Sequence, residues 1–130
     1  MKTINQLSKE IHENAKSKGF FDEPKNIGEM LCLIHSEVSE ALEADRKGQY
    51  ANVPSHDSYM EFWKLKTTDK NALTETAYRN NIKGSFEEEL ADIMIRVMDL
   101  AAFKGIDLEK HIELKMAYNA TREHKHGKKY

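Results

Sequence analysis

The sequence predicts an all-α protein, a helical bundle of four main helices with a helical insertion. Apolar residues recur every three or four positions in four segments, which places them on one face of a helix. Each of the first three segments is followed by a glycine, a common residue at helix ends. No segment alternates apolar and polar residues as a strand does. A chain of 130 residues with 39% apolar composition buries only a small core, so we also expect an oligomer.

Helix-end signals support these four segments, which lie at about residues 3–18, 26–47, 86–104 and 108–123. Ser85 and Glu88 match the pattern of a capping box at the start of the third segment. Asp107 is a typical N-cap residue immediately before the fourth.

Residues 49–84 separate the second and third main helices. Their apolar residues favour two short helices, the first around Tyr59 and Trp63 and the second beginning near Thr68 or Asp69. The stretch is otherwise polar, so a partly mobile excursion is the alternative. In either case it is an insertion between two helices of the bundle.

Length and composition predict a single domain over 1–130. The net charge of -2 gives no general attraction to nucleic acid or to a membrane surface. No apolar run approaches the roughly 20 residues that span a bilayer, and the first residues lack the apolar core of a signal peptide. Cys32 is the only cysteine, so no internal disulfide can form. We therefore expect a cytoplasmic protein.

Two pairs of acidic residues, each three positions apart, lie on apolar helices. The pairs are Glu37 with Glu40, in IHSEVSEALEADR, and Glu89 with Asp92, in FEEELADIMIRVMDL. Residues three apart share a helix face, where like charges repel. Bringing four carboxylates together between two helices is unfavourable unless a cation compensates them. Oxygen ligands of this kind suit Mg²⁺, Mn²⁺ or Ca²⁺.

The two pairs begin at the edge of an apolar face rather than opposite it. On a helical wheel, Glu37 falls about 80° from the centre of its apolar face, and Glu89 about 100°. Two such helices packed together would bring the four carboxylates around one or more cations. The simpler alternative is that both pairs belong to solvated faces, because 22 of the 130 residues are acidic.

The last predicted helix carries groups that bind phosphate. Lys115, Asn119 and Arg122 are spaced four and three apart, so they share a face, and Tyr118 adds a hydroxyl beside them. The basic tail that follows includes Lys128. Lysine and arginine bind phosphate through charge-assisted hydrogen bonds. The ordinary alternative is that these cations complement the helix dipole and are otherwise solvated.

In combination, these motifs resemble the MazG-type all-α nucleoside triphosphate pyrophosphohydrolases, including the small MazG-like and dCTP-pyrophosphatase-like branches. The pattern is E-x-x-E, then E-x-x-D, then K-x-x-x-N-x-x-R. The similar stretches cover most of the chain apart from the insertion and lie at 18–34, 35–48, 87–112 and 114–130. The motifs are specific as a set and weak one by one. The insertion departs from compact members, which leaves the preferred base and sugar open.

The resemblance implies hydrolysis of a nucleoside triphosphate to the monophosphate and pyrophosphate, by a homo-oligomer that is a dimer or a tetramer. The residues that match the acidic motifs would hold Mg²⁺, with Mn²⁺ as the alternative ion. They are Glu37, Glu40, Glu89 and Asp92. Phosphates would be bound by residues matching the basic motif and its tail, namely Lys115, Tyr118, Asn119, Arg122 and Lys128. Within this scheme we assign Glu37 and Glu40 to catalysis, with Glu40 as the general base because it lies further from the apolar face.

The nucleobase requires apolar or stacking groups, for which Phe21 and Trp63 are candidates. A core or interface role explains either aromatic residue equally well. Two other protein classes compete with the pyrophosphohydrolase. A di-iron carboxylate bundle needs two Glu-x-x-His motifs, whereas this chain has one, at Glu123 and His126. A non-catalytic helical adaptor, or a degenerate nucleotide binder, would use the same surfaces without hydrolysis.

Overall fold

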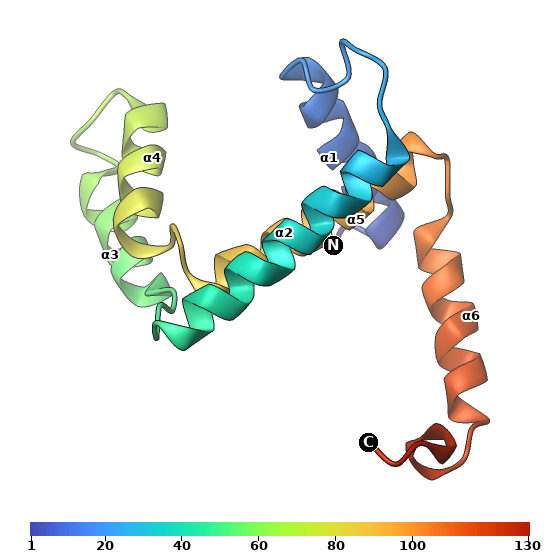
Figure 1. Cartoon of the computed structure of the whole chain (residues 1–130). Coiled ribbons are helices and arrows are strands. Elements are labelled where there is room, and N and C mark those ends of the chain that lie inside the picture. The colour runs from blue at the N-terminus through green and yellow to red at the C-terminus, as the bar shows by residue number, and fades with distance from the viewer. The chain divides into compact units, whose positions relative to one another are not determined.

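The computed structural model describes all 130 residues and contains six α-helices, one short 3₁₀-helix and no strand (Figure 1). This confirms the prediction of an all-α protein. No helix combines the length and the apolar character needed to cross a membrane. In chain order the helices are α1 (Ile4–Ser17), α2 (Ile27–Arg46), α3 (Val53–Trp63), α4 (Lys70–Asn81), α5 (Phe86–Phe103), α6 (Leu108–Ala120) and η1 (His124–Gly127).

The four main predicted helices correspond to α1, α2, α5 and α6. Gly19, Gly48 and Gly105 follow the first three of them in the left-handed conformation, with φ of 86°, 65° and 66°. This conformation strains other residues and ends a helix. The last helix stops at Ala120, earlier than the predicted end near residue 123, so Arg122 lies outside it.

The insertion is helical, as one of the two alternatives predicted. Asn52 caps α3 by accepting a hydrogen bond from Ser55 N, and Asp69 caps α4 by accepting one from Ala72 N. α3 and α4 lie side by side as a hairpin (Figure 1). Leu73 and Ala77 of α4 are buried, although the stretch is otherwise polar.

The predicted capping box at the start of α5 is only half formed. Ser85 Oγ accepts a hydrogen bond from Glu88 N at 3.2 Å, as expected. The Glu88 carboxylate accepts from Gly84 N and from the Tyr78 hydroxyl instead of from Ser85 N. Ser85 N donates to the Ile82 carbonyl, so it does not need the glutamate. The beginning of α5 is therefore tied to the end of α4.

The chain divides into two compact units. The terminal unit comprises Met1–Asn26 and Ile95–Tyr130, and the central unit comprises Ile27–Met94. The central unit holds both acidic motifs and the insertion, whereas the terminal unit holds the basic motif. The prediction of a single domain over 1–130 stays a prediction.

The central unit buries few apolar side chains. In α2 only the small residues Ala41 and Ala44 are buried among the apolar residues. Val38 and Leu42 of α2 are 49% and 50% exposed, although the apolar pattern predicts that they face a core. α2 therefore presents apolar surface that this unit does not cover.

The terminal unit joins α1 to α6 through their N-terminal ends. The Asn5 side chain donates to Asp107 Oδ1 at 2.7 Å, and the same oxygen accepts from Lys110 N as the N-cap of α6. These hydrogen bonds, led by the one from Asn5, lower the pKa of Asp107. The predicted N-cap is thus confirmed, and it also joins two helices.

Candidate metal centre

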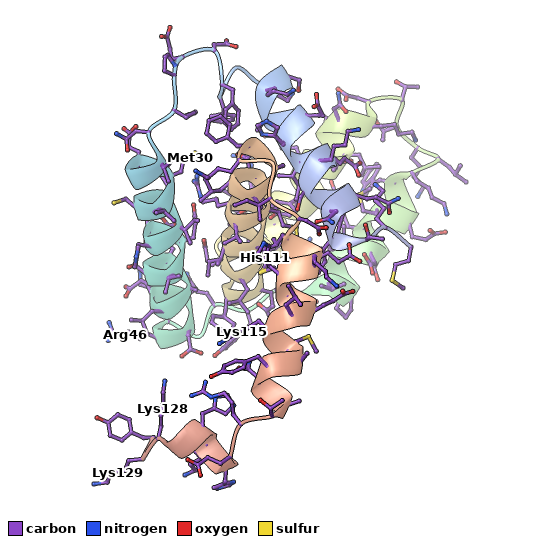
Figure 2. All side chains as sticks on the ribbon, turned by 90° about the vertical axis from the view of Figure 1, so that its right-hand side faces the viewer. Met30, Arg46, His111, Lys115, Lys128 and Lys129 are labelled. Carbon is purple, nitrogen blue, oxygen red and sulfur yellow. The ribbon has the colours of Figure 1, made fainter.

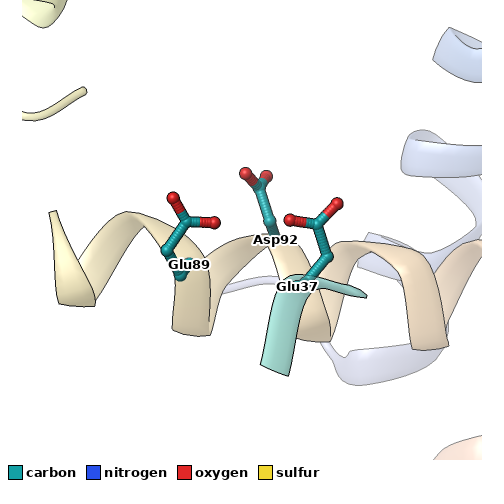
Figure 3. Close-up of side chains that lie close together, drawn as sticks. All are labelled: Glu37, Glu89 and Asp92. Atoms are coloured by element: carbon teal, nitrogen blue, oxygen red, sulfur yellow. The ribbon is translucent and has the colours of Figure 1, made fainter. Parts of the chain in front are cut away.

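Three carboxylates from two helices come together in the central unit. Glu37 of α2 and Glu89 and Asp92 of α5 each offer an oxygen, and these atoms all lie within 4.8 Å of one another (Figure 3). α2 and the first part of α5 run alongside each other, with side chains between them (Figure 2). In that view Met30 marks the first turn of α2 and Arg46 its last residue. We call these three residues the acidic cluster. It contains three of the four acids predicted from the sequence.

Local helix geometry explains how α5 contributes two of the three groups. Glu89 and Asp92 are three residues apart, so both project from one face of the helix. The start of α5 is fixed by the Ser85 cap and by the bonds that Glu88 accepts from Gly84 and Tyr78. Glu89 therefore lies in a helical turn whose position is fixed by hydrogen bonds of Ser85, the N-cap, and of Glu88, the preceding residue.

The acidic cluster is buried, which is unusual for carboxylates that lie so close together. Glu37 is 6% exposed and Glu89 is 7% exposed, while Asp92 is half-buried. Burial, followed by the charges of Glu40, Glu88, Glu37 and Asp92, raises the pKa of Glu89 from its usual 4.5 to about 7. Near neutral pH, the ionised cluster is therefore electrostatically unfavourable by itself.

Glu40 occupies a different position from the other three acids. It is exposed on α2 and is not a member of the acidic cluster. Glu40 nevertheless lies close to Glu89. Of all the neighbouring charges, the charge of Glu40 raises the pKa of Glu89 most. The structure thus separates one solvent-facing carboxylate from three clustered ones, a distinction that the sequence pattern alone does not draw.

Tyr78 of α4 is a residue near the acidic cluster that sequence reasoning missed. Its hydroxyl donates to Glu88 Oε1 at 2.8 Å. Burial raises its pKa above the usual range, and the hydrogen bond and charge of Glu88, followed by the charges of Asp92 and Glu89, raise it further. The only signal in the sequence is an aromatic residue in a polar insertion, which does not indicate where its hydroxyl lies.

The predicted phosphate-binding residues all belong to the terminal unit, and three of them contact one another. Lys115 Nζ and Arg122 Cζ both lie over the Tyr118 ring, at 5.0 Å and 5.6 Å from its centroid. Asn119 Oδ1 is buried without a hydrogen-bond partner. Lys115 lies on α6 and Lys128 in the tail (Figure 2). Arg122 reaches this group from beyond the helix end, rather than from the helical face that the sequence predicts.

The two candidate base-binding aromatics lie in different units. Phe21 belongs to the terminal unit, where the centroid of its ring lies 4.6 Å from that of His12 and 5.1 Å from that of Phe103. Trp63 belongs to the central unit, and the centroid of its ring lies 5.1 Å from that of Phe62. It lines a cavity of about 300 Å³ in the α3–α4 hairpin, together with Tyr59 and Lys66. Phe21 thus has the packing of a core residue, whereas Trp63 borders open space.

The donor set of the acidic cluster fits a hard divalent cation. Mg²⁺ and Mn²⁺ prefer oxygen ligands, and Mg²⁺ is commonly held by one or two carboxylates together with substrate phosphates. No histidine or cysteine belongs to the cluster, which disfavours zinc. The di-iron alternative also lacks support, because its characteristic histidine ligands are absent from the cluster.

Comparisons of the chain with models of protein families, with curated proteins and with solved structures found no match.

Proposed function

We propose that the chain is a metal-dependent nucleoside triphosphate pyrophosphohydrolase of the MazG type. It would hydrolyse a ribo- or deoxynucleoside triphosphate to the monophosphate and pyrophosphate, and so remove unwanted nucleotides from the cellular pool. The observation that carries this proposal is the convergence of Glu37, Glu89 and Asp92 from two helices. The E-x-x-E and E-x-x-D motifs that supply these residues are the ones on which the resemblance to the family rests.

The chemistry of the donor set supports the proposal. Glu37, Glu89 and Asp92 would hold Mg²⁺, with Glu40 as a further ligand or as the catalytic carboxylate. The ion would neutralise charge that develops on the α-phosphate and on the departing pyrophosphate. In the reaction, water adds to the α-phosphorus and the bond to the bridging oxygen of the β-phosphate breaks. The proton of the water passes to a carboxylate base.

Glu40 is our candidate for this base, because it is the solvent-facing carboxylate beside the acidic cluster. Replacing Glu40 with Gln keeps its shape and removes its basicity. We expect kcat to fall by roughly 100-fold or more, since general-base catalysis contributes at least this much. Because the side chain is exposed, thermal stability should hardly change.

Steady-state kinetics and thermal unfolding check this prediction. Glu43→Gln is the matched control, because Glu43 is also exposed on α2 and pairs with Lys47 at the surface. A folded Glu40→Gln variant that turns over like the wild type would remove Glu40 from the catalytic residues.

The basic residues of the terminal unit are proposed to bind the phosphates. Arg122 and Lys115 already lie over one tyrosine ring, which places two cations in one neighbourhood. The Asn119 side chain is half-buried, and its buried Oδ1 lacks a partner, so it has unused hydrogen-bonding capacity. Tyr118 and Lys128 would add a hydroxyl and a further charge.

We also propose that the protein is a homo-oligomer, a dimer or a tetramer, formed through α2. Val38 and Leu42 lie half-exposed on this helix, and apolar surface of this kind marks contact sites between proteins. Val38→Lys should therefore shift the protein toward monomers, because it places a charge in the interface.

Sedimentation velocity of the wild type and the variant measures this shift. Gln49→Lys, at an exposed polar position just beyond α2, introduces the same charge and should leave the oligomer intact. A wild type that is monomeric at micromolar concentration would contradict the interface assignment.

Product analysis tests the proposed reaction itself. The full chain is incubated with a panel of ribo- and deoxynucleoside triphosphates, with Mg²⁺ and then with EDTA. We expect monophosphate and pyrophosphate in equal amounts, only with the metal, and at rates that rank the bases. Folded protein that releases no pyrophosphate from any nucleotide would contradict the proposal and favour a helical adaptor or a degenerate nucleotide binder.

A further inference from the structure

A groove on α4, outside the acidic cluster, has no role in the function proposed above. It has a volume of about 430 Å³. Most of its lining surface is apolar, but two of the residues that line it are cations; the lining residues are Asn71, Thr74, Glu75, Tyr78, Arg79 and Lys83. All of these residues belong to the central unit, as the acidic cluster does.

The two cations of the groove are accessible. The Arg79 side chain is 64% exposed, and Lys83 is exposed just beyond the end of α4. Arg79 forms an ion pair with Glu75, one helical turn earlier. Exposed ion pairs contribute little to stability, so Arg79 can exchange this partner for another anion at small cost. A guanidinium and an ammonium that line the same groove suit phosphate oxygens.

Tyr78 connects the groove to the acidic cluster. It lines the groove, and its hydroxyl donates to Glu88, the residue next to Glu89. The negative charges of Asp92 and Glu89 also act on the Tyr78 hydroxyl, which places the phenol in the electric field of the cluster. Tyr78 therefore links the groove that it lines to Glu88, the neighbour of Glu89.

We propose that this groove binds the phosphate chain of the nucleotide, through Arg79 and Lys83, beside a divalent cation held by the acidic cluster. The inference rests on the proposed function, and it adds a phosphate subsite within the central unit itself. A bare anion would be repelled by the neighbouring carboxylates. A polyphosphate complexed with a divalent cation satisfies both halves of the arrangement, because its cation meets the carboxylates and its oxygens meet Arg79 and Lys83.

Because Glu75 pairs with Arg79, the proposal predicts opposite changes in phosphate affinity when Glu75 and Arg79 are replaced. Glu75 competes with the phosphate for Arg79 and adds a negative charge to the groove. Glu75→Gln should therefore strengthen the binding of phosphate, by about threefold. Arg79→Gln and Lys83→Gln should each weaken it, by about tenfold.

Calorimetric titration of the full chain with inorganic pyrophosphate measures these changes without turnover. One arm contains Mg²⁺ and the other contains EDTA. Lys64→Gln is the matched control, because Lys64 is an exposed lysine of the same hairpin that pairs with Glu61 instead of lining the groove. Circular dichroism verifies that the variants, all at exposed positions, are folded. Binding of Mn²⁺ without any anion is measured separately and reports on the acidic cluster alone.

The expected result is weaker binding for Arg79→Gln and Lys83→Gln, tighter binding for Glu75→Gln and no change for Lys64→Gln. Wild-type affinity in the Arg79 and Lys83 variants, or no pyrophosphate binding by the wild type, would overturn the subsite. A loss of affinity confined to Lys115→Gln and Arg122→Gln would also overturn it, by assigning the phosphates to the terminal unit. Failure of Mn²⁺ binding would instead count against the proposed metal centre. Because a bare anion is repelled by the carboxylates, we expect pyrophosphate to bind more weakly in the EDTA arm than in the Mg²⁺ arm.

Discussion

Replacing Glu89 with Gln is expected to abolish hydrolysis while stabilising the metal-free fold. Glu89 is the most perturbed member of the acidic cluster, and as a proposed cation ligand it acts only when ionised. An amide of the same shape carries no charge, so the affinity for Mg²⁺ falls and turnover drops by roughly 100-fold or more. Kinetics at saturating nucleotide, over a range of Mg²⁺ concentrations, measures this loss.

The gain in stability follows from the same carboxylate. Its pKa of about 7, against the usual 4.5, means that ionised Glu89 disfavours the folded state by at most about 3 kcal/mol. The neutral amide removes this penalty but must itself find hydrogen bonds when buried. We therefore expect a net stabilisation of about 1 to 3 kcal/mol at pH 8 in EDTA, measured by urea unfolding.

The combination of lost activity and gained stability is specific to a functional carboxylate. If a residue only holds the fold together, replacing it lowers both the activity and the stability of the protein. Glu43→Gln, an exposed change on α2, should alter neither quantity appreciably. Normal turnover in Glu89→Gln would remove this residue from the metal centre, and a destabilised variant would show that its charge is compensated within the chain.

Without metal, the contribution of Glu89 to stability should decline as the pH rises. Between about pH 4.5 and pH 7 the unfolded chain has released the Glu89 proton while the folded chain still holds it. The folded state therefore binds more protons in this window, so raising the pH favours unfolding. Below pH 4.5 both states are protonated, and the penalty is absent. Above pH 7 both are ionised, and the penalty is complete.

Urea unfolding of the wild type and Glu89→Gln in EDTA, from pH 4.5 to pH 8, isolates this contribution as a difference. The gap between the two proteins should open across the window and stay constant above it. Adding Mg²⁺ at pH 8 should stabilise the wild type more than the variant, because a ligand that binds the folded state stabilises it. A gap that does not depend on pH would refute the burial of an uncompensated carboxylate at this position.

The sequence predicted the helices well because their signals are local. Asp107 and Asp69 are caps whose partners lie three residues away, and Gly19, Gly48 and Gly105 end helices by their own backbone freedom. The prediction of a capping box was only half right, because the Glu88 carboxylate binds a residue that lies further away in the sequence. The Tyr78 hydroxyl binds Glu88, and no local rule indicates that α4 reaches the start of α5.

The candidate site was only partly predictable, for a similar reason. Spacing of three places Glu89 and Asp92 on one face of a helix, and the apolar edge indicates where Glu37 points. Whether Glu40 lies inside or outside the cluster depends on the packing of α2 against α5, which one helix does not encode. The exposure of Val38 and Leu42 was unexpected, because periodicity shows which residues are apolar but not what covers them.

Direct measurement of cation binding tests the central claim, that Glu37, Glu89 and Asp92 form a metal centre. Mn²⁺ is titrated into the metal-free full chain at pH 8 and the free ion is followed by electron paramagnetic resonance. The proposal predicts saturable binding by the wild type that is weakened at least about tenfold in Glu89→Gln and unchanged in Glu43→Gln. Equal Mn²⁺ affinity in the wild type and in Glu89→Gln, or no binding by either, would contradict it.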